Sequence, residues 1–217
     1  MYYQLYWYCN GLEFKVDLMN WQDFTALLVL ATAMSFSPGP NTTLATALAA
    51  NGGLRHAMRF VFAVPVGWSA LLLLTAGGLG ALVVAAPALR LAIKAVGVAY
   101  LLWLAFRLSG SGQLGSADDK RMNVGFWQGV ALQFLNIKAW LLALTIVAGW
   151  VAGQGNPSQR LFIVVPVMVA FAFASNLTYA AAGALLRQWL SHGRRLLWFN
   201  RAMALVLVLT AGWMMRV

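Results

Sequence analysis

Acidic residues are scarce in this chain of 217 residues. It has five Asp and Glu against fifteen Lys and Arg, and charged residues make up 9% of the sequence. In a soluble domain about a quarter of the residues are charged. Hydrophobic residues make up 62% here. Such a sequence has too little polar side chain to cover a soluble fold, so the composition indicates an integral membrane protein.

Cysteine and the signatures of enzymes are also missing. Cys9 is the single cysteine, which excludes an intramolecular disulfide and a thiolate metal site made by this chain alone. The sequence has no His-Glu-x-x-His motif, no nucleotide-binding loop and no pair of carboxylates within an apolar segment. We therefore expect no enzymatic activity, no cofactor and no metal ion.

Six apolar segments are present, each long enough to cross a membrane, for which about 20 residues are needed. The predicted fold class is an all-α integral membrane protein with six transmembrane helices. The predicted spans are 24–50, 59–84, 87–107, 126–150, 160–186 and 196–215.

A polar linker at 109–123, predicted to be cytoplasmic, separates two halves of three spans each, 19–108 and 124–217. Because the number of spans per half is odd, the second half is inverted in the membrane relative to the first, and we predict two inverted three-helix repeats. Residues 1–18 form an N-terminal tail rich in Tyr and Trp. This tail is either an interfacial segment or a consequence of start-site choice, since Met19 also begins an ordinary lead-in to the first span.

The basic excess, a formal net charge of +10, lies between the apolar segments rather than along one face. This disfavours nucleic acid as a partner and favours anionic lipid. By the positive-inside rule, the side with more Lys and Arg is cytoplasmic and both termini are external. The cytoplasmic set is Arg55, Arg59, Arg107, Lys120, Arg121, Arg187, Arg194, Arg195 and Arg201, and the external set is Lys15, Arg90, Lys94, Arg160 and Arg216.

Two prolines interrupt the first apolar segment near its centre, in Ser37-Pro38-Gly39-Pro40-Asn41. Proline lacks a backbone N–H and clashes with the preceding helical turn. In a membrane such a break is tolerated where the freed groups face protein or a water-filled cavity. We predict a discontinuous helix whose second half begins at Pro40, with N–H groups that favour an anion. Broken helices of this kind mark substrate sites in transporters; a kinked packing helix is the alternative.

Lys138 is the one charged residue deep within a span. It lies about a dozen residues, or roughly 18 Å, from the predicted cytoplasmic end, where a cation costs at least about 2.5–3.5 kcal/mol. No acidic residue lies within the spans. Its partner is therefore a set of backbone carbonyls, water or a ligand carboxylate. Capping of the carbonyls freed in the first span and contact with a substrate are both compatible with this position.

Other polar residues interrupt the fourth and fifth spans. Gln133 and Asn136 share a helical face, but Asn136 and Lys138 point about 200° apart, so a site that contains all three requires a distorted helix. Asn176 and Tyr179 share a face and either bind a polar solute or clamp two helices. Glycines of the second span and at the end of the fourth are expected to pack closely against neighbours: Gly77, Gly78, Gly80, Gly149 and Gly153.

Several of these motifs together resemble the LysE/RhtB family of amino-acid exporters. They are Ser37-Pro38-Gly39-Pro40-Asn41, Ala-Asn-Gly-Gly before Arg55, the stretch from Ala99 to Ala105, and Asn-x-Lys at 136–138. The resemblance covers the chain from about Met19 to its end. Most of the family has Asn-Pro-Lys, whereas Ile137 replaces the proline here, and the stretch 131–138 looks most like the branch that exports cysteine and O-acetylserine.

The resemblance implies a multi-pass exporter of the bacterial inner membrane that moves small neutral amino acids by alternating access. It also suggests proton antiport, with Lys138 or a histidine as carrier because no carboxylate is buried. The expected partners are an amino-acid substrate and membrane lipid, with a homodimer left open. The alternative is a lipid-handling or structural membrane protein. The candidate substrate-binding residues are Ser37, Gly39, Pro40, Asn41, Thr42, Gln133, Asn136, Lys138, Asn176 and Tyr179.

Overall fold

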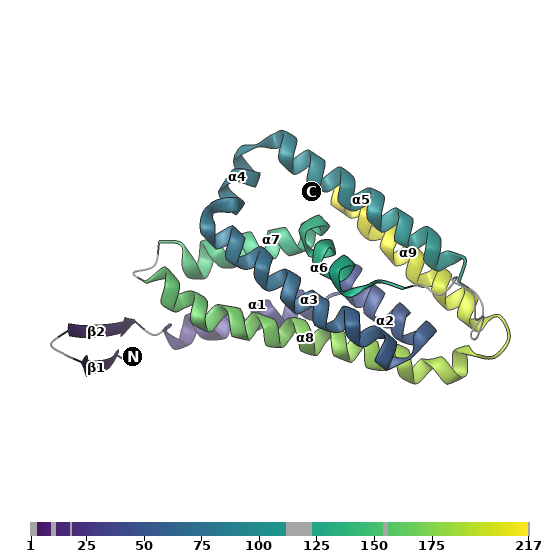
Figure 1. Ribbon diagram of the computed structural model, residues 1–217, viewed down its shortest axis with the longest axis horizontal. Coiled ribbons are helices and arrows are strands. Elements are labelled where there is room, and N and C mark those ends of the chain that lie inside the picture. Colours follow the sequence, from purple (N-terminus) through teal and green to yellow (C-terminus); the bar gives the residue numbers. More distant parts are fainter. Residues whose placement is uncertain (1–3, 10–11, 18, 112–122, 154–155, 217) are drawn as a thin grey trace.

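The computed structural model describes residues 4–9, 12–17, 19–111, 123–153 and 156–216. After an N-terminal hairpin, these residues form six helical segments that run back and forth along the molecule (Figure 1). The first three are α1 (Trp21–Phe36) with α2 (Pro40–Gly52), α3 (Leu54–Leu74) continued by η1 (Thr75–Leu79) and α4 (Gly80–Ala85), and α5 (Pro87–Ser109). The other three are α6 (Phe126–Leu135) with α7 (Ile137–Ile146) and η2 (Val147–Val151), α8 (Pro157–Leu190), and α9 (Arg195–Arg216).

Four of these segments are long and apolar enough to cross a membrane, namely 54–85, 87–109, 157–190 and 195–216. The segment 126–151 is bent by 68° at Asn136 and makes a fifth if both parts belong to one span. The helices α1 and α2 have 16 and 13 residues, each shorter than the about 20 that a span needs. Length and composition thus support four or five spans, and a sixth formed by α1 with α2 stays a prediction.

The predicted all-α class holds for the described residues from Met19 onward, whereas the N-terminal tail, for which no helix was predicted, contains two short strands. Residues Gln4–Cys9 (β1) and Leu12–Asp17 (β2) pair as an antiparallel hairpin, with Gln4 opposite Asp17 and Tyr6 opposite Lys15. Aromatic and β-branched residues favour strands, and β1 contains Tyr6, Trp7 and Tyr8 while β2 contains Phe14 and Val16. Asn10-Gly11, a preferred hairpin dipeptide, separates them in the sequence. Residues 1–3 and most of the predicted linker, 112–122, lie outside the described residues.

The two halves of the chain pack through matching pairs of helices. The helix α2 packs against α8, and α6 packs against α3; likewise α1 contacts α8, and α7 contacts α3. The long helices α3 and α8 pack against each other, as do α5 and α9, which form a pair that leans away from the other helices (Figure 1). The two main contacts between the first segment of one half and the second segment of the other thus have counterparts.

Two hydrophobic cores lie on opposite sides of the helix breaks. One contains Leu44, Leu48 and Phe60, with residues of α5 and α9. The other contains Leu27 and Ile146, with residues of α3 and α8. Because each broken segment contributes to both cores on either side of its break, the breaks themselves lie between two well-packed regions.

Close helix packing depends on glycines other than the predicted ones. A Cβ atom on Gly67 would lie 2.7 Å from the carbonyl oxygen of Val130, and one on Gly183 would collide with the backbone of Thr46. The expectation for Gly77, Gly78, Gly149 and Gly153 was wrong, because no neighbouring atom lies within 4 Å of a Cβ built there. Gly78 instead has a φ of 106°, which a glycine adopts without strain, at the bend between α3 and α4. Of the predicted set, Gly80 alone is tightly packed, against Thr75 and Leu144.

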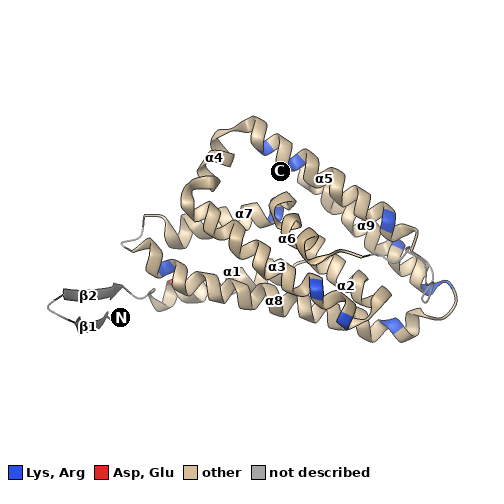
Figure 2. Cartoon of the chain, in the orientation of Figure 1, with Lys and Arg blue, Asp and Glu red and all other residues tan. Residues whose placement is uncertain are grey.

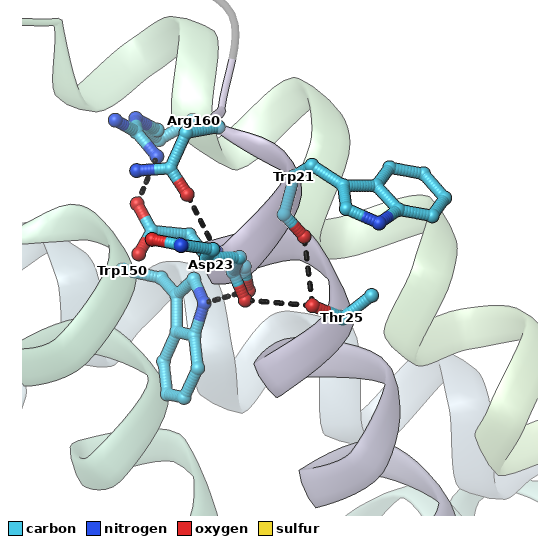
Figure 3. A network of polar contacts seen from close by, with 7 residues as sticks. Trp21, Asp23, Thr25, Trp150 and Arg160 are labelled. Atoms are coloured by element: carbon cyan, nitrogen blue, oxygen red, sulfur yellow. Dashed lines mark hydrogen bonds and ion pairs between the residues drawn. The ribbon is translucent and has the colours of Figure 1, made fainter. Parts of the chain in front are cut away.

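Polar clasps hold both ends of the helical body. At the end rich in Lys and Arg (Figure 2), the buried amides of Asn51 and Asn200 exchange two hydrogen bonds of 2.8 and 2.9 Å between α2 and α9. At the other end, the indole of Trp150 donates to the Asp23 carbonyl at 2.8 Å, and Arg160 lies 3.6 Å from the Asp23 carboxylate (Figure 3). This second clasp joins α1, η2 and α8.

Candidate functional site

Three backbone carbonyls at the first helix break accept hydrogen bonds from side chains. Pro38 and Pro40 have no N–H, so α1 ends at Phe36 and α2 begins at Pro40. The Ser37 hydroxyl donates to the carbonyl of Met34 at 3.0 Å. The Tyr179 hydroxyl donates to that of Phe36 at 2.8 Å, and the Lys138 ammonium donates to that of Ser37 at 3.1 Å. The side chains of Ser37 itself, of Lys138 in α7 and of Tyr179 in α8 therefore bond these three carbonyls.

The second break lies at Asn136 and is the helix distortion that the positions of Gln133, Asn136 and Lys138 required. Asn136 has an extended backbone (φ −94°, ψ 102°) between α6 and α7. Its side-chain oxygen accepts the N–H of Lys138 at 3.1 Å, which caps the start of α7. The indole of Trp140 donates to the carbonyl of Phe134 at 2.8 Å, across the break. Without a proline, the capping asparagine and this indole hold the break open.

The two breaks are bound to each other by the second residue of each new helix. Lys138 in α7 donates to the Ser37 hydroxyl at 2.7 Å, in addition to the Ser37 carbonyl. Asn41 in α2 and Gln133 in α6 exchange two amide hydrogen bonds, of 2.8 and 3.2 Å. Thus α7, which follows the second break, bonds the end of α1, and α2, which follows the first break, bonds the end of α6.

Gly39 makes room for Lys138. A Cβ atom at Gly39 would lie 3.3 Å from the lysine Nζ atom, which is a tight contact. The backbone of Gly39 is extended (φ −177°), a conformation open to any residue, so space rather than conformation favours glycine here. The position of Gly39 therefore indicates close approach of the ammonium group to the chain.

A cavity of about 60 Å³ lies where the breaks meet, with room for a few water molecules. Eight of the ten candidate residues line it: Ser37, Gly39, Pro40, Asn41, Thr42, Asn136, Lys138 and Asn176. Gln133 is fully buried behind Asn41, and Tyr179 contacts the break from outside the cavity lining. Thr42 is occupied locally, since its hydroxyl caps the start of α2 by bonding Gly39.

Two buried polar atoms on the cavity wall have no hydrogen-bond partner. They are the indole Nε1 of Trp68 in α3 and the amide Oδ1 of Asn176 in α8. The two side chains are 4% and 3% exposed, and unpaired groups at such burial are rare in folded proteins. Trp68 is not among the predicted residues. The available signal was an indole near the middle of an apolar span, whose N–H needs an acceptor when buried.

A second cavity, of about 410 Å³, lies on the other side of Lys138. Its wall comprises Met34, Ser37, Pro38, Lys138, Val206, Leu209, Thr210 and Trp213. It shares Met34, Ser37 and Lys138 with the smaller cavity. These three residues therefore border both cavities.

The electrostatics of the smaller cavity favour an anionic group. Lys138 is the one charged residue in its lining among the residues that the structure describes. The first N–H groups of α2 have no acceptor within their own helix and carry the positive end of its dipole. Two of the three ammonium hydrogens of Lys138 bond Ser37, which leaves one for a carboxylate.

Comparison with known proteins agrees with the motif-based resemblance. Residues 32–216 match the family described as LysE type translocator. The chain is 36% identical over 188 residues to a cysteine/O-acetylserine efflux protein of Salmonella paratyphi A, covering 84% of this chain and 91% of that protein. Similar proteins of the same name from Escherichia coli K12 and Klebsiella pneumoniae are 35% and 31% identical, covering 84% and 82% of this chain and 91% of each relative. No solved structure gives a significant match.

Proposed function

Because this chain belongs to the LysE family of translocators, we propose that it is a membrane transporter that exports small neutral amino acids or their derivatives, with cysteine and O-acetylserine as the first candidates. The relatives with that name are efflux proteins, which favours transport over catalysis. The observation that carries the proposal is the meeting of two half-helix starts and the ammonium of Lys138 at one buried cavity.

The substrate carboxylate is bound between the first turn of α2 and Lys138. Ser37 holds the lysine through both its carbonyl and its hydroxyl, at 3.1 and 2.7 Å. A carboxylate competes with these neutral acceptors for the ammonium group, and charged hydrogen bonds are about twice as strong as neutral ones. Lys138 therefore serves first as a cap for the broken helix and then as a ligand for the substrate.

Alternating access is supported by the position of Lys138 between two cavities. Met34, Ser37 and Lys138 border both the smaller cavity and the larger one that α9 lines. A movement of the α5–α9 pair relative to the broken helices would change which cavity reaches the lysine. The matching packing of the two halves supports the inverted repeat that such a mechanism uses in other transporters.

The proposal is tested by efflux from proteoliposomes loaded with cysteine, O-acetylserine, homoserine, threonine, leucine or lysine. We expect saturable efflux of cysteine or O-acetylserine, and at least about a hundredfold loss in Lys138→Ala, since the substrate carboxylate then lacks its charged partner. Repeating the assay with an imposed pH gradient tests proton coupling, which predicts faster efflux when protons enter as substrate leaves.

Lys94→Ala is the matched control for this experiment. Lys94 lies in α5 in the external part of the predicted third span, and its ammonium bonds the Met215 carbonyl at 3.1 Å rather than the Ser37 break. We expect wild-type efflux from this variant. Lack of movement of any amino acid by correctly inserted wild-type protein would overturn the proposed function, and a changed lipid distribution in the same vesicles would favour lipid handling.

A further inference from the structure

The two unpaired atoms of Trp68 and Asn176 have opposite hydrogen-bonding character. An indole N–H is a donor only, and an amide oxygen is an acceptor only. They belong to neighbouring helices, α3 and α8, that pack against each other. Both residues line the cavity that also contains Lys138. A ligand that bonds both atoms must therefore accept a hydrogen bond from Trp68 and donate one to Asn176. It must also place an anionic group near the Lys138 ammonium.

Other tryptophans and asparagines in the same core are satisfied. The indole of Trp140 donates to Phe134 and that of Trp150 donates to Asp23, both at 2.8 Å. The oxygen of Asn136 accepts from the N–H of Lys138. The amide nitrogen of Asn176 itself bonds the Ala172 carbonyl at 2.8 Å, which fixes the side chain and leaves only its oxygen unpaired. Trp68 and Asn176, whose polar atoms lack partners, thus both belong to the lining of the smaller cavity.

We infer that Asn176 Oδ1 accepts a hydrogen bond from the substrate ammonium group and that Trp68 Nε1 donates a hydrogen bond to an acceptor in the substrate side chain. This inference rests on the proposed efflux function, in which Lys138 already takes the carboxylate. An ammonium group only donates, so the unpaired oxygen fits it. The indole then selects amino acids whose side chains contain an ester, hydroxyl or sulfur acceptor, and disfavours hydrocarbon side chains that would leave it unpaired.

The size of the selection follows from the cost of an unpaired buried donor. Removing the acceptor from a substrate that fills the site lowers binding about tenfold or more. Sites that hydrogen-bond a substrate discriminate strongly against analogues that lack the bonding group. We therefore expect wild-type protein to prefer O-acetylserine over its hydrocarbon isostere 2-amino-5-methylhexanoate by at least about tenfold in the ratio of maximal rate to KM.

The decisive variant is Trp68→Phe, which keeps an aromatic ring and removes the N–H. We expect the preference for O-acetylserine over the isostere to fall to about one- to threefold, since neither substrate then leaves a donor unpaired. Trp150→Phe is the matched control, because it removes an indole N–H that is bonded within the protein, to the Asp23 carbonyl, at a distance from the breaks. Its selectivity ratio should equal that of the wild type.

Asn176→Leu separates the two roles. Because both substrates carry the same ammonium group, this variant should weaken both about equally and leave the ratio unchanged. If the selectivity ratio is unchanged in Trp68→Phe, with or without an equal loss for both substrates, the assignment of Trp68 is overturned. Wild-type efflux would still support the proposed function. Lack of wild-type efflux would overturn that function, and this inference with it.

Discussion

The reciprocal amide pair between Asn41 and Gln133 is the most direct link between the two broken helices. Gln133 is fully buried, and its Nε2 atom also donates to the Gly129 carbonyl at 3.0 Å. In a low-dielectric interior, a satisfied pair of this kind fixes geometry, whereas a half-satisfied one is costly. Gln133 therefore acts on the site through Asn41 rather than by contact with the cavity.

Loss of one partner of this pair should destabilise the protein by about 1–3 kcal/mol, because the other amide stays buried without its partner. We expect Asn41→Leu and Gln133→Leu each to show this loss in detergent unfolding. In the double variant the losses should not add, with a coupling energy of about 0.5–3 kcal/mol. Strictly additive losses would show that the two amides do not stabilise each other.

Several residues at the site followed from their chemistry alone. Lys138 had no acidic partner within the spans, so backbone carbonyls were among its predicted partners, and the structure gives it the Ser37 carbonyl. Trp68 could not be found in this way, because its importance comes from the absence of a partner in three dimensions. Tyr179 and Asn176 shared a face in the sequence, yet Tyr179 binds the Phe36 carbonyl while Asn176 lines the cavity.

At the scale of helices, the break in the first segment was predictable and the break in the fourth only partly so. Two prolines force the first, whereas the second depends on Asn136 and Trp140, which sequence periodicity does not distinguish from ordinary helical residues. The N-terminal hairpin was missed because the aromatic residues were interpreted as interfacial rather than as strand formers. Hydropathy predicted six spans, whereas length and composition of the helices support four, or five if 126–151 is one span.

The close approach of α2 and α8 depends on Gly183, which has no Cβ atom. We expect Gly183→Ala to destabilise the protein by about 1–3 kcal/mol, because the added Cβ meets the backbone of Thr46, which cannot move independently of α2. Gly212→Ala in α9 is the control, since no neighbour lies within 4 Å of its added Cβ. Thermal unfolding in detergent distinguishes them, and equal midpoints would contradict the close approach of α2 and α8.

At the scale of the whole molecule, the α5–α9 pair is the part least enclosed by the rest. It contacts the other helices mainly through α2 and α6, while cavities of about 410 and 470 Å³ lie along its inner side. The first of these reaches Lys138. Movement of this pair is therefore the simplest large rearrangement that would alter access to the site.

A cross-link across the larger cavity should stop transport. In a Cys9→Ser background, we expect Met34→Cys with Leu209→Cys, treated with a bifunctional thiol reagent, to lose at least about nine-tenths of efflux, because gating by rigid-body movement is then blocked. The pair Lys94→Cys with Met215→Cys joins α5 to α9 themselves and should retain efflux after the same treatment. Full activity in both cross-linked proteins would exclude movement of this pair as the gate.

The Asn51–Asn200 clasp also constrains the order of assembly. Its partners are 149 residues apart in the chain, so at about 5–20 residues per second the ribosome makes Asn200 roughly 7–30 s after Asn51. Until then the Asn51 amide has only the Ala47 carbonyl of its own helix. During synthesis the end of α2 therefore has no partner from α9 until the last helix has been made.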